Sequence, residues 1–166
     1  MDLTHDQVRA FVGPEADYYL DRWHRIRDEW GSRALGFNWA AFFLTLSWLL
    51  YRRMYRGFWI AIAVWVASFI LVLLAMVLAA LYKMPILVTL LGLGLGVTSL
   101  AVPVLFGIYG TYWYYLHARR QISQLTAAGQ VDPATIGNMG GTNLSAAVVS
   151  AVVIGFMAIW AEHGSP

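Results

Sequence analysis

The chain has 166 residues, of which 60% are hydrophobic and only 12% charged, and its formal net charge at pH 7 is +2. A soluble domain is about 25% charged, so this chain has too few charged residues to cover a water-facing surface. It contains no cysteine, which excludes disulfides, thiolate metal sites and cysteine nucleophiles within it. The composition therefore predicts an integral membrane protein.

The first 36 residues are polar and charged, and they contain neither the apolar core nor the cleavage site of a signal peptide. We therefore expect residues 1–36 to form a cytoplasmic amphipathic helical region. Thr4 and Gln7 fit a capping box at the start of a first helix, and Gly13 is a typical helix end.

A second helix is predicted from Pro14 to Gly31, with proline in its first turn and glycine at its end. Such a helix packs either on a membrane surface or on the protein's own cytoplasmic loops, and the sequence leaves both open. Its apolar face consists of side chains at spacings of 4, 3 and 4 residues: Tyr19, Trp23, Ile26 and Trp30.

Residues 37–56 raise the main topological question, because they begin with an uncharged run of 15 residues, Phe37 to Tyr51. A helix of that length measures about 22 Å, against about 30 Å of hydrocarbon. If the run crosses, the eleven Lys and Arg residues divide six to five; if it does not, ten lie on one side and Lys83 alone on the other. Loops rich in Lys and Arg beside membrane spans lie mainly in the cytoplasm, which favours the ten-to-one division. We therefore expect a short re-entrant or interfacial apolar helix.

Residues 57–161 form the predicted membrane domain, with transmembrane helices at about 57–82, 86–116 and 144–161. The middle tract is longer than one upright helix requires. Pro103 within it favours a kinked or tilted helix, and a hairpin of two short arms is the alternative.

The expected fold class is therefore an all-α integral membrane protein with three spans, a polar loop at 118–143 and a tail at 162–166. The first part of the polar loop, 118–129, is compatible with a short surface helix. The three spans contain no Asp, Glu, Lys or Arg, which disfavours ion-coupled transport.

Small residues in the middle tract predict close helix packing. Gly92 and Gly96 form a G-x-x-x-G pair, and Gly107 and Thr111 repeat the spacing on another face. A phosphate-binding role for the glycines is disfavoured, because neither the strand nor the soluble unit of a dinucleotide-binding motif is present.

Aromatic and cationic side chains at the ends of the apolar segments are typical of anchors at the headgroup level of a membrane. We predict this role for Trp23, Trp30, Trp39, Trp48, Tyr51, Arg52, Arg53, Tyr55, Tyr112, Trp113, Tyr115, Arg119 and Arg120.

The histidines give little indication of a bound group. His117 is a candidate pigment or haem ligand, but no second histidine lies in any span, which favours an ordinary interfacial residue. His5, His24 and His163 have no metal-binding spacing. We therefore predict no metal and no cofactor. No nucleophile–base pair can be assembled either, so we do not expect an enzyme.

Three stretches, FVGPEADYYLDRW, FNWAAFFLTLSWLLYRRMYRG and FGIYGTYWYYLHARRQI, resemble the bacterial membrane family known as domain of unknown function 2628. The family resemblance implies a bacterial inner-membrane location and no chemistry. The residues that carry it are Phe11, Val12, Gly13, Tyr19, Trp23, Phe37, Asn38, Trp39, Trp48, Tyr51, Arg52, Met54, Tyr55, Gly107, Tyr115 and His117.

The leading functional hypothesis is a non-enzymatic accessory or scaffold subunit, which packs laterally against a larger bacterial membrane complex, for example respiratory or photosynthetic. The alternative is a membrane protein that binds or transports a small molecule or lipid. The expected partners are the lipid bilayer and other membrane protein subunits. Nucleic acid is not expected, because the basic residues flank apolar segments. The expected location is the bacterial inner membrane, with several spans and a cytoplasmic amino terminus.

Overall fold

A computed structural model describes residues 3–28 and 36–163, and this part of the chain is helical without strands. Its helices are α1 His5–Val12, α2 Ala16–Asp28, α3 Trp39–Phe43, α4 Thr45–Tyr51, α5 Tyr55–Leu81, α6 Pro85–Ala127, α7 Pro133–Met139 and α8 Leu144–His163.

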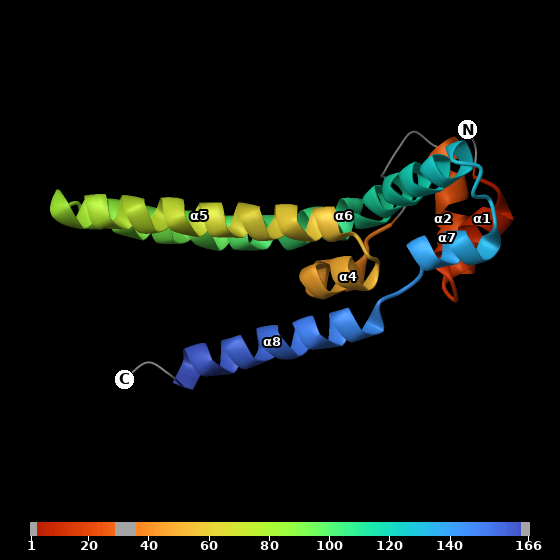
Figure 1. The fold of residues 1–166 in the computed structure, drawn as a ribbon. Helices are drawn as coiled ribbons and strands as arrows, with labels where there is room; N and C mark the ends of the chain where they lie inside the picture. Colours follow the sequence, from red (N-terminus) through yellow and green to blue (C-terminus); the bar gives the residue numbers. More distant parts are fainter. Residues whose placement is uncertain (1–2, 29–35, 164–166) are drawn as a thin grey trace.

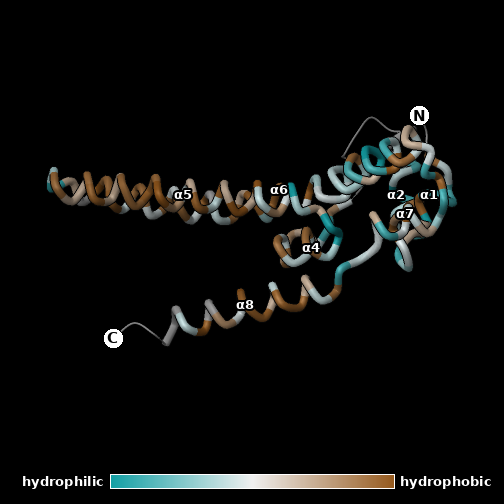
Figure 2. Tube along the Cα trace, viewed as in Figure 1, coloured by the Kyte–Doolittle hydropathy of each residue, from teal (hydrophilic) through white to brown (hydrophobic). Residues whose placement is uncertain are grey.

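Three segments are long and apolar enough to cross a membrane: Tyr55–Leu81, Ile86–Ala127 and Pro133–Phe156. The first two correspond to α5 and α6, which lie side by side as an antiparallel hairpin (Figure 1), and the third contains most of α8. Figure 2 shows hydrophobic residues along α5, the adjacent part of α6 and α8. The predicted class, an all-α membrane protein with three spans, is confirmed.

A helical cap lies at one end of the hairpin and consists of α1, α2, α7 and the last turns of α6 (Figure 1). The Thr4–Gln7 capping box is present at the start of α1, and Gly13 ends that helix with a φ of 78°. The backbone N–H of Gly141, just after α7, donates to the carbonyl of Phe11. These contacts bury the apolar side of α1 against its neighbours.

The polar segment 118–143, predicted as a polar loop with a separate short surface helix allowed at its start, differs in the structure. Its first ten residues continue α6 without interruption to Ala127, and residues 133–139 form α7. The reason is that Ala118, Ile122 and Leu125 repeat an apolar face, which is buried against the cap. The middle tract is therefore one continuous helix with Pro103 inside it, and not a hairpin.

The ends of α4 and α5 share one turn geometry. In each, a cationic residue adopts a left-handed backbone, Arg53 and Lys83 both with φ 54°, and the methionine that follows donates its N–H to a carbonyl five residues earlier. This is the Schellman arrangement that closes a helix end. It turns the chain sharply after α4, so that Arg52 stays at the cap end of the membrane domain.

The segment from Phe37 to Tyr51 forms α3 and α4, which join at Leu44. The backbone N–H of Asn38 donates to Gly107 of α6, and the N–H of Asn143, just before α8, donates to Tyr51. The middle of the segment lies deeper, beside Trp65, Pro103 and Ile154 of the three spans. The apolar run therefore folds back between α5–α6 and α8 (Figure 1) as two short helices, α3 and α4, hereafter the re-entrant pair.

Asn38 fixes the start of this re-entrant pair. Its side-chain oxygen accepts from the N–H of Ala41 at 2.9 Å, and its amide nitrogen donates to Thr111 Oγ1 at 3.2 Å. Both Asn38 and Thr111 are buried, so each polar group depends on the other for a partner.

Replacing Asn38 with alanine removes the helix cap and leaves the Thr111 hydroxyl without this partner. We expect the Asn38→Ala variant to lose about 2 kcal/mol of stability, the sum of a lost cap and an unsatisfied buried hydroxyl. Thermal unfolding in detergent measures the loss, with Gln130→Ala in the exposed loop after α6 as the control. Equal melting temperatures for the two variants would contradict this role of Asn38.

Candidate functional site

The centre of the structure is a buried arginine. Arg52 caps the carboxyl end of α4 and is only 2% exposed. Its guanidinium carbon lies 4.6 Å from the ring centre of Tyr19, 5.0 Å from that of Tyr51 and 5.1 Å from that of Tyr114. Tyrosine faces attract cations at such distances. Three tyrosines from α2, α4 and α6 therefore surround one cation.

Glu15, just before α2, supplies the opposite charge. Arg52 Nη2 donates to Glu15 Oε2, and the Tyr51 hydroxyl donates to Glu15 Oε1 at 3.2 Å. The two charged side chains are unequally buried, because that of Arg52 is 1% exposed and that of Glu15 is 47% exposed. The carboxylate is thus the solvent-accessible half of the ion pair.

Burial of this cluster is costly. Arg52 Nε, Arg52 Nη1 and the Tyr114 hydroxyl are buried without a hydrogen-bond partner among the described residues. Desolvation lowers the pKa of Arg52 and raises the pKa of Tyr19, so the arginine keeps less preference for its charged form and the tyrosine remains neutral. Each unsatisfied buried group costs about 1–3 kcal/mol, which the ring contacts and Glu15 must offset.

A cavity of about 600 Å³ opens beside the ion pair, between α2, the re-entrant pair and the first turn of α8. Its volume is in the range of small-molecule sites. Most of its wall is apolar. Its polar side chains are those of Glu15, Tyr18, Tyr19, Asn38, Ser47, Tyr51 and Arg52.

A second cavity, of about 370 Å³, continues deeper among the spans. Leu44 and Ser47 contribute to the walls of both cavities, so the two adjoin along α8. The wall of the deeper one is mainly apolar and includes Phe43, Trp65 and Ile154. A hydrogen bond of 2.9 Å from Ser150 to Ser47 ties α8 to the re-entrant pair between them. Together the cavities offer one end with a charged pair and one end without charged side chains.

The predicted interface anchors occupy different environments. Trp23, Trp48 and Arg52 are buried within the protein, and Trp30 lies outside the described residues. Those that are exposed are Trp39, Tyr55, Arg119 and Arg120, and those that are partly buried are Tyr51, Arg53, Tyr112, Trp113 and Tyr115.

The predicted packing residues also divide into two groups. Gly107 and Thr111 contact the start of the re-entrant pair, and a Cβ added at Gly107 would lie 2.3 Å from the Phe37 ring. Around Gly92 and Gly96 no other part of the described chain comes within 4 Å of an added Cβ. His117, the candidate ligand, is partly buried with its ring centre 6.1 Å from that of Phe11.

Sequence reasoning missed Glu15, Tyr19 and Tyr114 as partners of Arg52. The apolar face predicted for the second helix was a partial indication of this cluster, because two of its residues, Tyr19 and Trp23, are buried against Tyr114 of α6. This apolar face was predicted to pack either on a membrane surface or on the protein itself. For its described side chains the structure shows packing on the protein itself.

Residues 6–120 match the family model described as protein of unknown function DUF2628. The match covers more than half of the chain, so this protein belongs to that family. No curated protein and no solved structure matched the chain. The matched residues include Glu15, Arg52 and the three tyrosines around it, and they end before α7 and α8.

Replacing Glu15 with glutamine removes the negative charge beside a buried cation. We expect the Glu15→Gln variant to lose about 1–2 kcal/mol of stability, less than the 3–5 kcal/mol of a fully buried pair, because Glu15 is half exposed. The double variant Glu15→Gln/Arg52→Met should recover part of that loss, because no unpaired charge remains.

The matched control is Asp17→Asn, which breaks the exposed Arg9–Asp17 ion pair of the same cap. Its effect on thermal unfolding should be close to zero. Equal losses for Glu15→Gln and Asp17→Asn would show that the Arg52 cluster does not depend on its carboxylate.

Proposed function

We propose that this membrane protein has a non-catalytic binding role, and that its ligand is a membrane lipid with an anionic headgroup. The observation that carries the proposal is the pair of adjoining cavities, one lined by the Arg52–Glu15 ion pair and one among the spans without a charged side chain in its wall. A phosphate or carboxylate fits the first, and an acyl chain fits the second.

Charge favours an anionic headgroup. Arg52 lines the cavity together with one carboxylate, that of Glu15, and Arg53 and Arg56 follow Arg52 at the turn between α4 and α5. Arginine binds phosphate and carboxylate oxygens well, because its N–H groups form charge-assisted hydrogen bonds with them. The Glu15 carboxylate stands where the lipid anion would bind. Since Glu15 is half exposed, it can turn outward and give its place to the ligand.

Native mass spectrometry after gentle detergent extraction tests the proposal. Wild-type protein should retain an anionic phospholipid or fatty acid, and Glu15→Gln should retain more of it, because the competing carboxylate is gone. Arg52→Gln should retain at least about tenfold less, since a charge-assisted hydrogen bond contributes about 1.5–3 kcal/mol.

A cavity variant separates binding from folding. Ala147 of α8 lines the cavity beside the ion pair, whereas its neighbour Val148 is exposed and does not line it. Ala147→Trp should reduce lipid retention, and Val148→Trp should not. Unchanged lipid retention in Glu15→Gln, Arg52→Gln and Ala147→Trp would refute the proposal. The co-purifying lipid would then be bilayer lipid bound without a specific site.

A second candidate function is lateral association as an accessory or scaffold subunit of a larger membrane complex. Two observations favour it. Within the described part, α8 packs extensively only on α4, and a Cβ added at Gly92 or Gly96 would meet no other part of the described chain within 4 Å. A helix of another subunit can approach such a surface closely. The same mass measurement detects a co-purifying subunit, and a chain that stays alone and monodisperse would contradict this role.

We further propose a bacterial cytoplasmic membrane with the cap in the cytoplasm. The arginines of the cap and of the α4–α5 turn lie at one end of the spans, whereas Lys83 lies in the α5–α6 turn at the far end (Figure 1). Such a distribution is typical of a cytoplasmic cationic side.

A further inference from the structure

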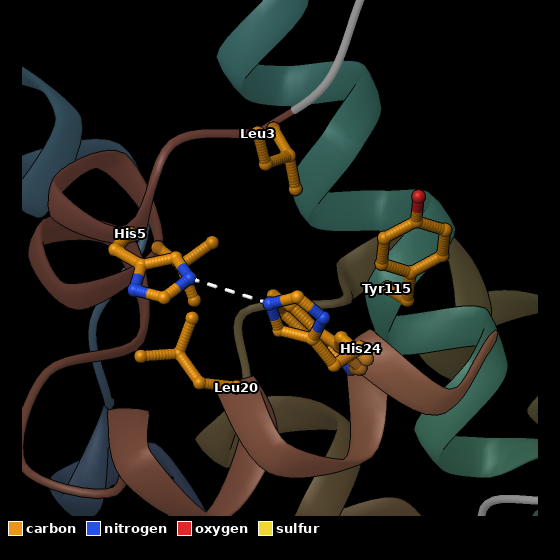
Figure 3. Close-up of a pocket in the computed structure, with 7 residues that line it drawn as sticks. Leu3, His5, Leu20, His24 and Tyr115 are labelled. Atoms are coloured by element: carbon orange, nitrogen blue, oxygen red, sulfur yellow. Dashed lines mark hydrogen bonds between the residues drawn. The ribbon is translucent and has the colours of Figure 1, made fainter. Parts of the chain in front are cut away.

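Two histidines that are 19 residues apart meet in the cap. His5 is the first residue of α1 and His24 lies on α2, and their Nε2 atoms are 3.4 Å apart. The rings are perpendicular, with an interplanar angle of 89°. Figure 3 shows the two imidazoles facing each other across a pocket between these helices.

The spacing of the two nitrogens matches a shared metal ion. Zinc binds imidazole nitrogen at about 2.0–2.1 Å in a tetrahedron, which places two such nitrogens about 3.3 Å apart. The observed separation of 3.4 Å is close to this value. In the metal-free protein the same contact is a long hydrogen bond, drawn in Figure 3, in which the protonated ring donates to the other.

The pocket around the pair is small and mostly apolar at its sides. Leu3, Val8 and Leu20 line it, and the Tyr115 ring forms another wall with its hydroxyl directed away from the histidines (Figure 3). Its volume is about 110 Å³, which is room for about three waters at about 30 Å³ each. Trp23 also lines the pocket, and its indole nitrogen is buried without a hydrogen-bond partner among the described residues.

We propose that His5 and His24 bind one divalent transition-metal ion, with water in the remaining positions. No group of three or more His, Cys, Asp or Glu side chains with metal-binding geometry occurs in the described chain, so the protein supplies two ligands and the ion is exchangeable. Two imidazoles suit Cu²⁺, Ni²⁺ and Zn²⁺, with Cu²⁺ bound more tightly than Zn²⁺, and they do not suit Mg²⁺. The bound ion links α1 to α2 and thereby stabilises the cap on the membrane domain.

The test uses the full chain in detergent, purified without a histidine tag and treated with a chelator. Isothermal titration with ZnCl2, and separately with CuCl2, should give one ion per chain and a higher melting temperature. Loss of one ligand in His5→Ala or His24→Ala should weaken affinity at least about 100-fold, because even lost outer-shell partners cost about 10–100-fold. His117→Asn, which alters a histidine outside the pair, is the matched control and should keep full affinity.

A spectroscopic measurement on the wild-type protein tests the same site without any variant. The electron paramagnetic resonance spectrum of wild-type protein with one equivalent of Cu²⁺ should show coupling to two imidazole nitrogens. Absence of binding, coupling to fewer than two such nitrogens, or equal affinity in His5→Ala, His24→Ala and wild type would overturn the proposal. The last result would identify adventitious metal only.

Discussion

The structure depends on one buried cation. A guanidinium removed from water must be compensated by groups around it, and here those groups come from parts of the chain that are distant in sequence. Glu15 precedes α2, Tyr19 belongs to α2 and Tyr114 to α6. Because Arg52 contacts all three, it joins the cap to the membrane domain. It also places residues before and after the re-entrant pair at the same end of the spans.

The sequence predicts the elements of this fold better than their contacts. Hydrophobic length predicts α5, α6 and α8, the Thr4–Gln7 box predicts the start of α1, and a run too short to cross predicts the re-entrant pair. The environment of Arg52 is different. An arginine at the end of an apolar run has the local pattern of a headgroup anchor, and its burial depends on partners 37 and 62 positions away. Local periodicity carries no information about such distant contacts.

The His5–His24 pair and the end of α6 illustrate the same limit. The spacing of 19 residues between the histidines fits no metal motif, yet the turn between α1 and α2 brings their nitrogens together. Similarly, charged residues after position 117 indicated the end of a span, whereas the buried face of Ala118 and Ile122 continues the helix into the cap. In both cases the packing of α1 and α2 against α6 decides the outcome.

The contacts of Arg52 require both ends of the re-entrant pair to lie on one side of the membrane. The cysteine-free chain permits single-cysteine labelling at Asp17 in the cap, Arg56 after the pair and Tyr82 in the α5–α6 turn, all exposed. In intact cells a membrane-impermeant reagent should label a cysteine at position 82 and leave cysteines at positions 17 and 56 unlabelled. In opened membranes it should label positions 17 and 56 as well. Labelling of 17 and 56 from opposite sides would mean that residues 37–51 cross the membrane, and the contact between Arg52 and Glu15 could not then exist.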